Sequence, residues 1–262
     1  MISRLAGLFR SAKLPQISAG RRVYAVGDVH GRADLLNKAQ TMIEADARTH
    51  PDKEKIVVFL GDFIDRGPDS RGVVEALINW MPADCGLVCL RGNHEAVLLD
   101  FLAGEDVGTD WLSFGGLETI LSYGLKLDRV PTTDAAFEDL RQKLAEAVPR
   151  RHLAWMGDLP LTHCEGDYLF VHAGLKPKVA LEQQQERDLL WIRDEFLSYG
   201  GSFGAMVVHG HSIRYEAEVK TNRIGIDTGA YRSGRLTALV LERDTRRFLA
   251  TALAEGSYAA AA

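Results

Sequence analysis

VYAVGDVHGRADLL, residues 23–36, runs from a short apolar segment through two polar side chains into an amphipathic segment. Asp28 and His30 stand directly after the apolar run and directly before a glycine. Leu35 and Leu36 then begin a series of apolar residues with helical spacing. A strand, a polar turn and a helix in this order are the beginning of a βαβ unit. The stretch therefore predicts an α/β protein with metal-capable side chains at the end of its first strand.

Short β-branched apolar runs continue to alternate with amphipathic segments along the chain, which is typical of the α/β class. Residues 96–160 contain no clear strand but several helical segments, which predicts a helical insertion packed over one edge of the sheet. Strands are predicted at 23–29, 55–64, 86–92, 167–172, 205–209, 223–227, 236–241 and 247–251.

The composition is that of an ordinary globular protein, with 262 residues, 46% of them hydrophobic and 26% charged. The net charge is −5, so nothing in the whole-chain charge favours a nucleic-acid polymer or an anionic membrane as a partner. No run approaches the ~18 apolar residues of a membrane span, and we expect no stable membrane insertion. Because the whole chain is acidic, any affinity for phosphate must come from a local cluster of positive charge. The sequence indicates no particular oligomeric state.

One domain over residues 23–254 is expected, because no linker or low-complexity tract divides the chain. Residues 1–22 carry five basic side chains and no acidic one, which favours a flexible basic extension over a helix that binds a partner or a membrane surface. Residues 255–262 are predicted to form a disordered tail.

The three cysteines, Cys85, Cys89 and Cys164, are odd in number and lack a CxxC spacing. We interpret them as reduced core residues. Reduced thiols indicate a reducing compartment, so a cytoplasmic location is expected.

Four further polar blocks follow predicted strands: FLGDFIDRGPDS at 59–70, LRGNHE at 90–95, LFVHAG at 169–174 and VVHGHS at 207–212. A single Asp-x-His at a strand end is usually no more than a hydrogen-bonded turn. Five such blocks in order are a different matter. The carboxyl ends of parallel strands meet at one crevice, so these side chains are predicted to converge on one site.

The candidate metal ligands combine carboxylate and amide oxygens with imidazole nitrogens and include no thiolate. Such a set suits divalent first-row metals rather than structural zinc. Six ligands exceed what one catalytic ion takes from a protein, which favours two metal ions that share a carboxylate. The candidates are Asp28, His30, Asp62, Asn93, His172 and His211.

These blocks resemble the calcineurin-like metallophosphoesterases, and more narrowly the PPP-type serine/threonine phosphoprotein phosphatases of bacterial type. The narrower resemblance rests on GDFIDRGPDS and LRGNHE. WLSFGGLETILSYG at 111–124 and IGIDTGAYRSGRLTALVLE at 224–242 add to it. It implies a central β-sheet sandwich flanked by helices, with the helical insertion as a cap. It covers about residues 23–242.

The resemblance also implies how the ligands are divided. VVHGHS offers two histidines, and the one that follows glycine, His211, is the implied ligand, which leaves His209 behind the site or in the core. Asp62 bridges the two ions. The first ion is held by Asp28, His30 and Asp62, and the second by Asp62, Asn93, His172 and His211.

The remaining roles implied by the resemblance concern the phosphate and the leaving group. His94 protonates the leaving oxygen as a general acid, and Asp65 orients its ring. Arg66 clamps the phosphate in bidentate fashion, and Arg193 is a second phosphate-binding arginine. Glu95 is expected to fix neighbouring groups by hydrogen bonding rather than to bind metal.

Three aromatic residues and two histidines in and beside the insertion need an interpretation. Trp111, Phe114 and Tyr123 either line a substrate groove or pack between helices. His152 and His163 are interpreted as surface or capping residues rather than ligands.

The function expected from the resemblance is hydrolysis of phosphoserine and phosphothreonine by in-line attack of a metal-bridging hydroxide. Mn²⁺ is the favoured metal, with iron or zinc as alternatives. The substrate is a phosphorylated protein or a small phosphate-containing molecule. The leading alternative is a symmetric dinucleoside tetraphosphate hydrolase, while a phosphodiesterase or a catalytically dead phospho-binding adaptor is less favoured.

Overall fold

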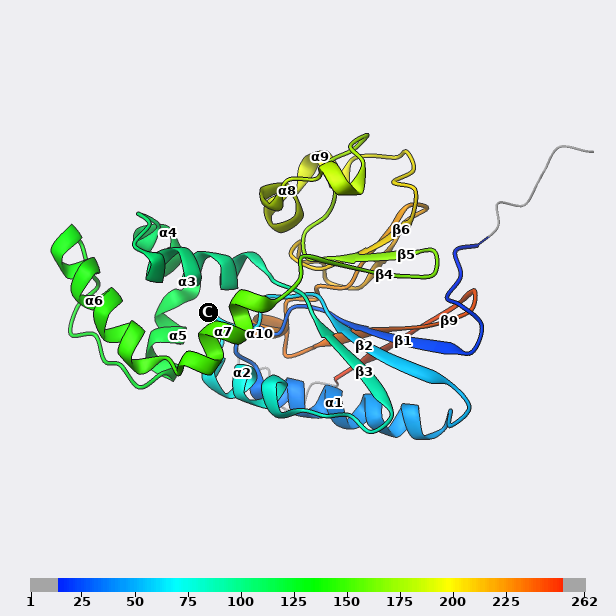
Figure 1. Ribbon diagram of the computed structural model, residues 1–262, viewed down its shortest axis with the longest axis horizontal. Coiled ribbons are helices and arrows are strands. Elements are labelled where there is room, and N and C mark those ends of the chain that lie inside the picture. The colour runs from blue at the N-terminus through cyan, green and yellow to red at the C-terminus, as the bar shows by residue number, and fades with distance from the viewer. Residues whose placement is uncertain (1–13, 252–262) are drawn as a thin grey trace, which may run out of the picture.

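Two five-stranded mixed sheets stack face to face in the computed structural model of the protein, which describes residues 14–251 (Figure 1). In the first sheet β1, β2 and β3 are parallel, β9 is antiparallel to β1, and β10 is antiparallel to β9. Its order is β10 (Thr245–Ala250), β9 (Thr237–Glu242), β1 (Arg21–Val26), β2 (Glu54–Phe59) and β3 (Cys85–Cys89). The second sheet has the order β4 (Thr162–Glu165), β5 (Tyr168–Val171), β6 (Met206–His209), β8 (Arg223–Gly225) and β7 (Glu218–Val219).

Alternating side chains of both sheets form the core of the sandwich. Val23 and Ala25 of β1 point to the second sheet, while Tyr24 and Val26 point to the opposite face. This alternation is the two-residue period of a strand buried on both sides. From the second sheet, Tyr168, Phe170, Met206, Val208 and Ile224 join the same core.

Helices cover both outer faces, so the molecule has four layers (Figure 1). The first sheet packs on α1 (Ala33–Arg48) and α2 (Ser70–Asn79), whose buried residues join one cluster with Tyr24 and Val57. The second sheet packs on α8 (Glu186–Trp191) and α9 (Asp194–Leu197), which follow the short helix η2 (Leu181–Gln183). The predicted sandwich flanked by helices is confirmed.

The region between β3 and β4 is helical, as expected for the cap. Its apolar side chains continue the helical layer over the first sheet and share its core cluster. One irregularity interrupts it, a π-helical turn in which Gly115 has a positive φ. The helices are α3 (Asn93–Ala103), α4 (Gly108–Trp111), η1 (Leu112–Gly116), α5 (Leu117–Ser122), α6 (Asp134–Ala147) and α7 (Arg150–Asp158), and α10 (Ala230–Ser233) follows β8 later in the chain.

The strand predictions missed two strands and extended a third one too far. β4 and β7 were missed, because β4 is a short edge strand of polar residues and β7 has only two residues. The strand predicted at 55–64 ends at Phe59 in the structure. Residues 60–64 form the loop that carries Asp62, and Leu60, Phe63 and Ile64 are fully buried there. Their burial in a loop explains why they look like strand residues in the sequence.

The boundary of the predicted basic extension lies too far along the chain. β1 begins at Arg21, and Ile17 is buried and donates its backbone N–H to Arg243 O at 2.8 Å. Gln16 N donates to Asp167 Oδ2 at 2.9 Å. Residues 14–22 are therefore part of the packed structure. The predictions for residues 1–13 and 252–262 lie outside the described residues.

Two interpretations of single side chains were wrong. Cys89 is buried, but Cys164 is exposed on the edge strand β4, so it is not a core residue. His152 is fully buried, and its ring bonds to Tyr123 Oη at 2.9 Å and to Glu75 Oε2 at 3.0 Å. It is a satisfied core histidine that joins α7 to α2 and α5.

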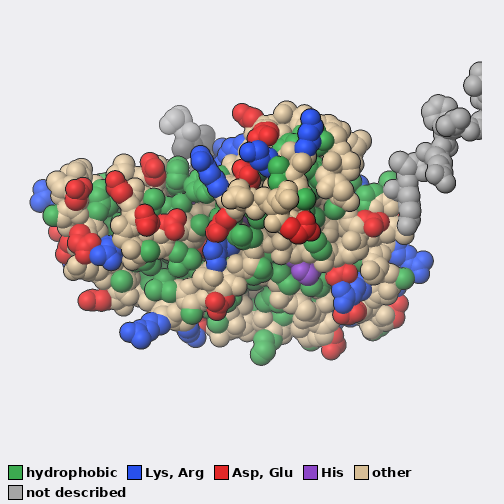
Figure 2. All heavy atoms as spheres, turned by 45° about the horizontal axis from the view of Figure 1, so that its top comes forward, with side chains coloured by type: hydrophobic (Ala, Val, Ile, Leu, Met, Phe, Trp, Pro, Cys, Tyr) green, Lys and Arg blue, Asp and Glu red, His purple; other side chains and the backbone are tan. Residues whose placement is uncertain are grey.

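Acidic and basic side chains are interspersed over the face shown in Figure 2, with no single sign dominating it. Within residues 14–251, every helix is too short or too polar to cross a bilayer.

Candidate active site

The predicted site residues come from the loops that leave the carboxyl ends of β1, β2, β3, β5 and β6. The first two loops are tied together, because the backbone N–H groups of Val29 and His30 both donate to Asp62 O, at 3.1 and 2.8 Å. Asn93 and His94 begin α3 immediately after the third loop. The predicted convergence of the five blocks is thus what the chain folding produces.

Asp62 lies at the centre of the cluster and is 1% exposed. Its Oδ2 is 3.5 Å from His30 Nε2, and its Oδ1 is 3.4 Å from His172 Nε2. Two groups of donors share this carboxylate: one adds His30 and His94 to it, and the other adds His172 and His211. A carboxylate shared between two donor groups is the arrangement that a pair of metal ions needs.

Two of the histidines are oriented by backbone carbonyls behind the site. His30 Nδ1 lies 2.9 Å from Ile64 O, and His172 Nδ1 lies 2.8 Å from Leu60 O. These bonds place the proton on Nδ1 and leave the Nε2 lone pair for the site. Asn93 Oδ1 is 2.9 Å from His172 Nε2, so the amide oxygen faces the same point.

Unpaired buried atoms show that the donor set suits cations. Asp28 Oδ1 and His211 Nε2 are buried and have no hydrogen-bond partner. Burial lowers the pKa of His30 well below its usual value, and it also lowers the pKa of His172 and His211. These imidazoles are therefore neutral near pH 7, which is the form that binds metal. Neutral imidazoles, carboxylates and an amide fit two divalent ions.

Five of the predicted site residues adopt a left-handed backbone conformation. A positive φ is uncommon in residues other than glycine and costs of order 1–3 kcal/mol when the surroundings enforce it. Such strain concentrates where side chains must be aimed at a common point. The five residues are His30 (φ 45°), Asp62 (φ 54°), Asp65 (φ 69°), Arg66 (φ 66°) and His211 (φ 59°).

Glu95 holds the loop that carries Asp62 from behind. Its carboxylate accepts from the backbone N–H groups of Gly92, Asp62, Phe63 and Ile64 at 2.7–3.2 Å. Four donors to one buried carboxylate fix the loop and leave no lone pair free for a metal ion. The expectation that Glu95 fixes neighbouring groups by hydrogen bonding is confirmed.

His94 and Asp65 form a buried pair beside the metal-binding cluster. His94 Nδ1 lies 2.6 Å from Asp65 Oδ2. Although burial lowers the pKa of His94, the carboxylates of Asp62 and Asp65 outweigh burial and raise it above its usual value. The geometry is that of a histidine oriented by a carboxylate, with Nε2 turned to the site.

The guanidinium of Arg66 spans the site. Its Nη1 lies 3.1 Å from His30 Nε2, and its Nη2 lies 3.0 Å from His94 Nε2. Arg66 Nε donates to Phe114 O at 3.2 Å, which ties the side chain to the insertion. The two terminal nitrogens of the guanidinium therefore face the position where a phosphate would lie between the two histidines.

Arg193 lies at the edge of this cluster. It is exposed and caps the N-terminus of α9. Its positive charge adds to burial in lowering the pKa of His172 and His211, so it acts on the same donors. Ten predicted site residues are thus brought together, with Arg193 on the rim.

Aromatic side chains line the rim. The Tyr231 ring lies 5.1 Å from the Arg66 guanidinium carbon and 5.5 Å from the His30 ring. Phe114 and Trp191 are half-buried, with ring centres 5.8 Å apart. Of the two readings for Phe114, this arrangement favours a wall of the substrate site. Trp111 and Tyr123 are buried and pack between helices.

Two further residues of the site, Thr119 and Asp227, were not predicted, and Trp111, predicted to line a groove or pack between helices, also contacts Asp65. Trp111 and Thr119 contact Asp65, and Asp227 lies beside Asp28, whose pKa is raised by burial and by the charge of Asp227. Their sequence blocks belong to the stretches that carry the resemblance. Nothing in a linear pattern shows that an indole in the insertion reaches a carboxylate 46 residues earlier.

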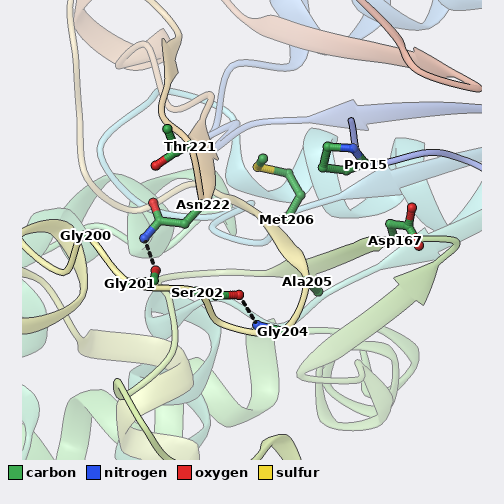
Figure 3. A pocket seen from close by; sticks show the side chains of 10 residues that line it. All are labelled: Pro15, Asp167, Gly200, Gly201, Ser202, Gly204, Ala205, Met206, Thr221 and Asn222. Atoms are coloured by element: carbon green, nitrogen blue, oxygen red, sulfur yellow. Dashed lines mark hydrogen bonds between the residues drawn. The ribbon is translucent and has the colours of Figure 1, made fainter. Parts of the chain in front are cut away.

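A cavity of about 440 Å³ lies at the opposite end of the second sheet, at the start of β6 and β8 (Figure 3). Asn222 Nδ2 donates there to Gly201 O at 2.7 Å, and Gly204 N donates to Ser202 Oγ at 3.0 Å. Asp167, the one charged residue in its lining, accepts from Gln16 N. Its lining contains no histidine and a single carboxylate, so the candidate active site remains the histidine cluster.

Removal of metal should lower the melting temperature. A ligand present at 100 times its Kd stabilises the folded state by about 2.7 kcal/mol, which corresponds to roughly 5 °C or more for a domain of this size. Melting followed with EDTA and then with excess Mn²⁺ measures the loss and the recovery. A His172→Ala/His211→Ala variant should respond much less, and an equal response would contradict binding at this cluster.

Comparisons with known proteins agree with this geometry. The family model for the calcineurin-like phosphoesterases matches residues 21–232. Serine/threonine-protein phosphatase 1 of Salmonella typhimurium is 31% identical over 223 residues, covering 83% of this chain and 90% of that protein. The asymmetrical bis(5'-nucleosyl)-tetraphosphatase PrpE of Anoxybacillus flavithermus is 29% identical over 225 residues, covering 82% and 88%. A solved structure of a provisionally assigned diadenosine tetraphosphatase shares the fold, with a TM-score of 0.59 and 22% identity over 91% of this chain and 98% of that one.

Proposed function

The chain belongs to the calcineurin-like phosphoesterase family of metal-dependent phosphatases, and on that premise we propose that it hydrolyses phosphoserine and phosphothreonine in proteins. The observation that carries the proposal is the buried His94–Asp65 pair, 2.6 Å apart, next to the guanidinium of Arg66. The alkoxide of serine or threonine is a strong base and a poor leaving group. Its departure benefits from a general acid more than the departure of a nucleotide phosphate does.

Arg66 and His94 would act in sequence during the reaction. Arg66 Nη2 lies 3.0 Å from His94 Nε2, and because a guanidinium can only donate, the lone pair of Nε2 accepts this hydrogen bond. A phosphate between His30 and His94 would provide oxygens as better acceptors for the arginine fork. Arg66 would then hold the phosphate, and His94 Nε2 would be free to carry the proton that the leaving oxygen receives.

The cluster around Asp62 would hold two divalent ions, and Mn²⁺ is the proposed metal. When bound, such ions activate water for attack on phosphorus and offset the charge of the phosphate. Asp28, His30 and Asp62 would bind one ion, while Asp62, Asn93, His172 and His211 would bind the other. Arg193 at the rim would add positive charge for an incoming phosphate.

Asymmetrical hydrolysis of a dinucleoside tetraphosphate is the second candidate. It is favoured by the half-buried rings of Phe114, Trp191 and Tyr231 at the rim, on which a base could stack. The symmetric enzyme considered from the sequence has no counterpart among the relatives above, whose dinucleotide-cleaving member is asymmetrical. A cytoplasmic location is also part of the proposal, because Cys85, Cys89 and Cys164 are all free thiols.

The Mn²⁺-loaded protein should prefer phosphopeptides. We expect kcat/KM for phosphoserine and phosphothreonine peptides to exceed that for diadenosine tetraphosphate by ~100-fold or more, or about 2.7 kcal/mol of transition-state stabilisation. Both substrates are assayed under one set of conditions, and nucleotide products are resolved by chromatography. The reverse preference, with ATP and AMP as products, would replace the proposal by the second candidate. A product of ADP alone would indicate the symmetric reaction.

A further inference from the structure

We propose that Trp111 and Thr119 are positioning residues that hold the Asp65 carboxylate against His94 from the helical insertion. The proposal rests on the proposed general-acid role of His94. Trp111 Nε1 donates to Asp65 Oδ2 at 3.1 Å and lies 3.3 Å from Oδ1. Thr119 Oγ1 donates to Asp65 Oδ1 at 2.5 Å. All three side chains are fully buried.

The two donors leave Asp65 one rotamer. With Oδ1 engaged by Thr119 and both oxygens near the indole, the oxygen that faces His94 Nδ1 is fixed at 2.6 Å. An indole N–H and a hydroxyl are neutral donors, so they orient the carboxylate without cancelling its charge. A lysine or an arginine in the same place would compete with His94 for that charge. Neutral donors therefore leave the full negative charge of the Asp65 carboxylate available to His94.

The backbone of Asp65 is held by the same groups. Its N–H lies 2.9 Å from Thr119 Oγ1 and 3.0 Å from Ser70 Oγ, and these two hydroxyls are 2.9 Å apart. Asp65 has a φ of 69°, a conformation that is uncommon outside glycine. Thr119 thus fixes both the strained backbone and the side chain of the residue that orients the acid.

Gly115 and Gly116 allow the insertion to approach this closely. Gly115 O accepts from Arg66 N at 3.0 Å, and a Cβ on Gly115 would lie 2.9 Å from that nitrogen. A Cβ on Gly116 would lie 2.5 Å from the indole of Trp111. One contact, in which the insertion packs against the turn at Asp65 and Arg66, therefore explains the spacing in WLSFGGLETILSYG of Trp111, the two glycines and Thr119.

Leaving-group dependence tests this inference. Trp111→Phe and Thr119→Val remove one donor each, and Thr119→Ser restores the hydroxyl. Thr119→Val keeps the volume, whereas Trp111→Phe also removes part of a buried ring, a change that the control below reproduces elsewhere. We expect the double variant to lose on the order of 10–100-fold in kcat on phenyl phosphate but less than about 3-fold on p-nitrophenyl phosphate, since only the poorer leaving group needs the acid. Thr119→Ser should recover most of the Thr119→Val loss.

Trp80→Phe is the matched control, because Trp80 Nε1 donates to the carboxylate of Glu44 at 2.8 Å, away from the site. It should change stability without changing the ratio of the two rates. Metal content and melting temperature are measured for each variant, so a folding or metal-loading defect is recognised separately. Equal losses on both aryl phosphates, in folded protein with normal metal content, would overturn the inference.

A mutant cycle that combines the double variant with His94→Asn gives a second, independent test. If Trp111 and Thr119 act through the acid, the double variant adds no selective loss once His94 is replaced. An undiminished selective loss in that background would show that the two residues act by another route. Failure of the wild-type protein to hydrolyse phosphopeptides would count against the proposed function alone, because the cycle uses aryl phosphates only.

Discussion

Asp62→Asn should abolish most of the activity together with most of the bound metal. The carboxylate is shared by two donor groups and lies 3.4–3.5 Å from His172 Nε2 and His30 Nε2. An amide in place of the Asp62 carboxylate removes one negative charge from between the two proposed metal positions. Replacing even a residue that only orients a ligand weakens metal binding about 10–100-fold, so loss of the shared ligand should exceed that. We expect kcat/KM to fall on the order of 10³-fold or more.

Metal analysis of the purified variant separates this cause from a local packing defect. The Asp62→Asn protein should retain about one equivalent of metal or fewer when the wild-type protein retains two. Asp69→Asn is the matched control, because Asp69 lies in the same block, is exposed and caps α2 by accepting from Gly72 N at 2.8 Å. Asparagine caps helices equally well. Full metal content in an inactive Asp62→Asn protein would contradict the shared-ligand role.

Much of this site could be predicted from the sequence because its residues stand at strand ends. Asp28, His172 and His211 each follow a run of apolar residues, and a buried strand of a parallel sheet leaves its carboxyl end at the common crevice. The order of the blocks then fixes which loops meet. The choice between His211 and His209 came instead from the resemblance; the structure groups His211 with Asp62 and His172, whereas His209 is buried with Nδ1 3.1 Å from its neighbour Gly210 O.

What could not be predicted depends on contacts between distant segments. β4 has no apolar pattern because it is an edge strand, and its pairing with β5 is visible only in three dimensions. Residues 60–64 look like a strand, because burial rather than strand pairing selects their side chains. Trp111 and Thr119 belong to helices of the insertion, and their helical spacing gives no sign that both reach Asp65.

His94→Asn should keep the metal and lose activity selectively on poor leaving groups. Asn93 and Asp62 remain in place, so two equivalents of metal are expected. The general acid is lost, however, because asparagine cannot deliver a proton to the leaving oxygen. General acid catalysis contributes about 10²–10⁴-fold. We therefore expect a loss of that size on phosphoserine peptides and of less than about 10-fold on p-nitrophenyl phosphate, whose leaving group departs without a proton.

His152→Asn is the matched control for this substitution. His152 is a fully buried histidine with two side-chain partners, Tyr123 and Glu75, and none of these atoms belongs to the candidate site. Its replacement should lower the melting temperature and leave the ratio of the two rates unchanged. Comparable losses of the His94→Asn protein on the two substrates would remove His94 as the acid. The His94–Asp65 pair would then orient the phosphate through Arg66, whose Nη2 is already 3.0 Å from His94 Nε2.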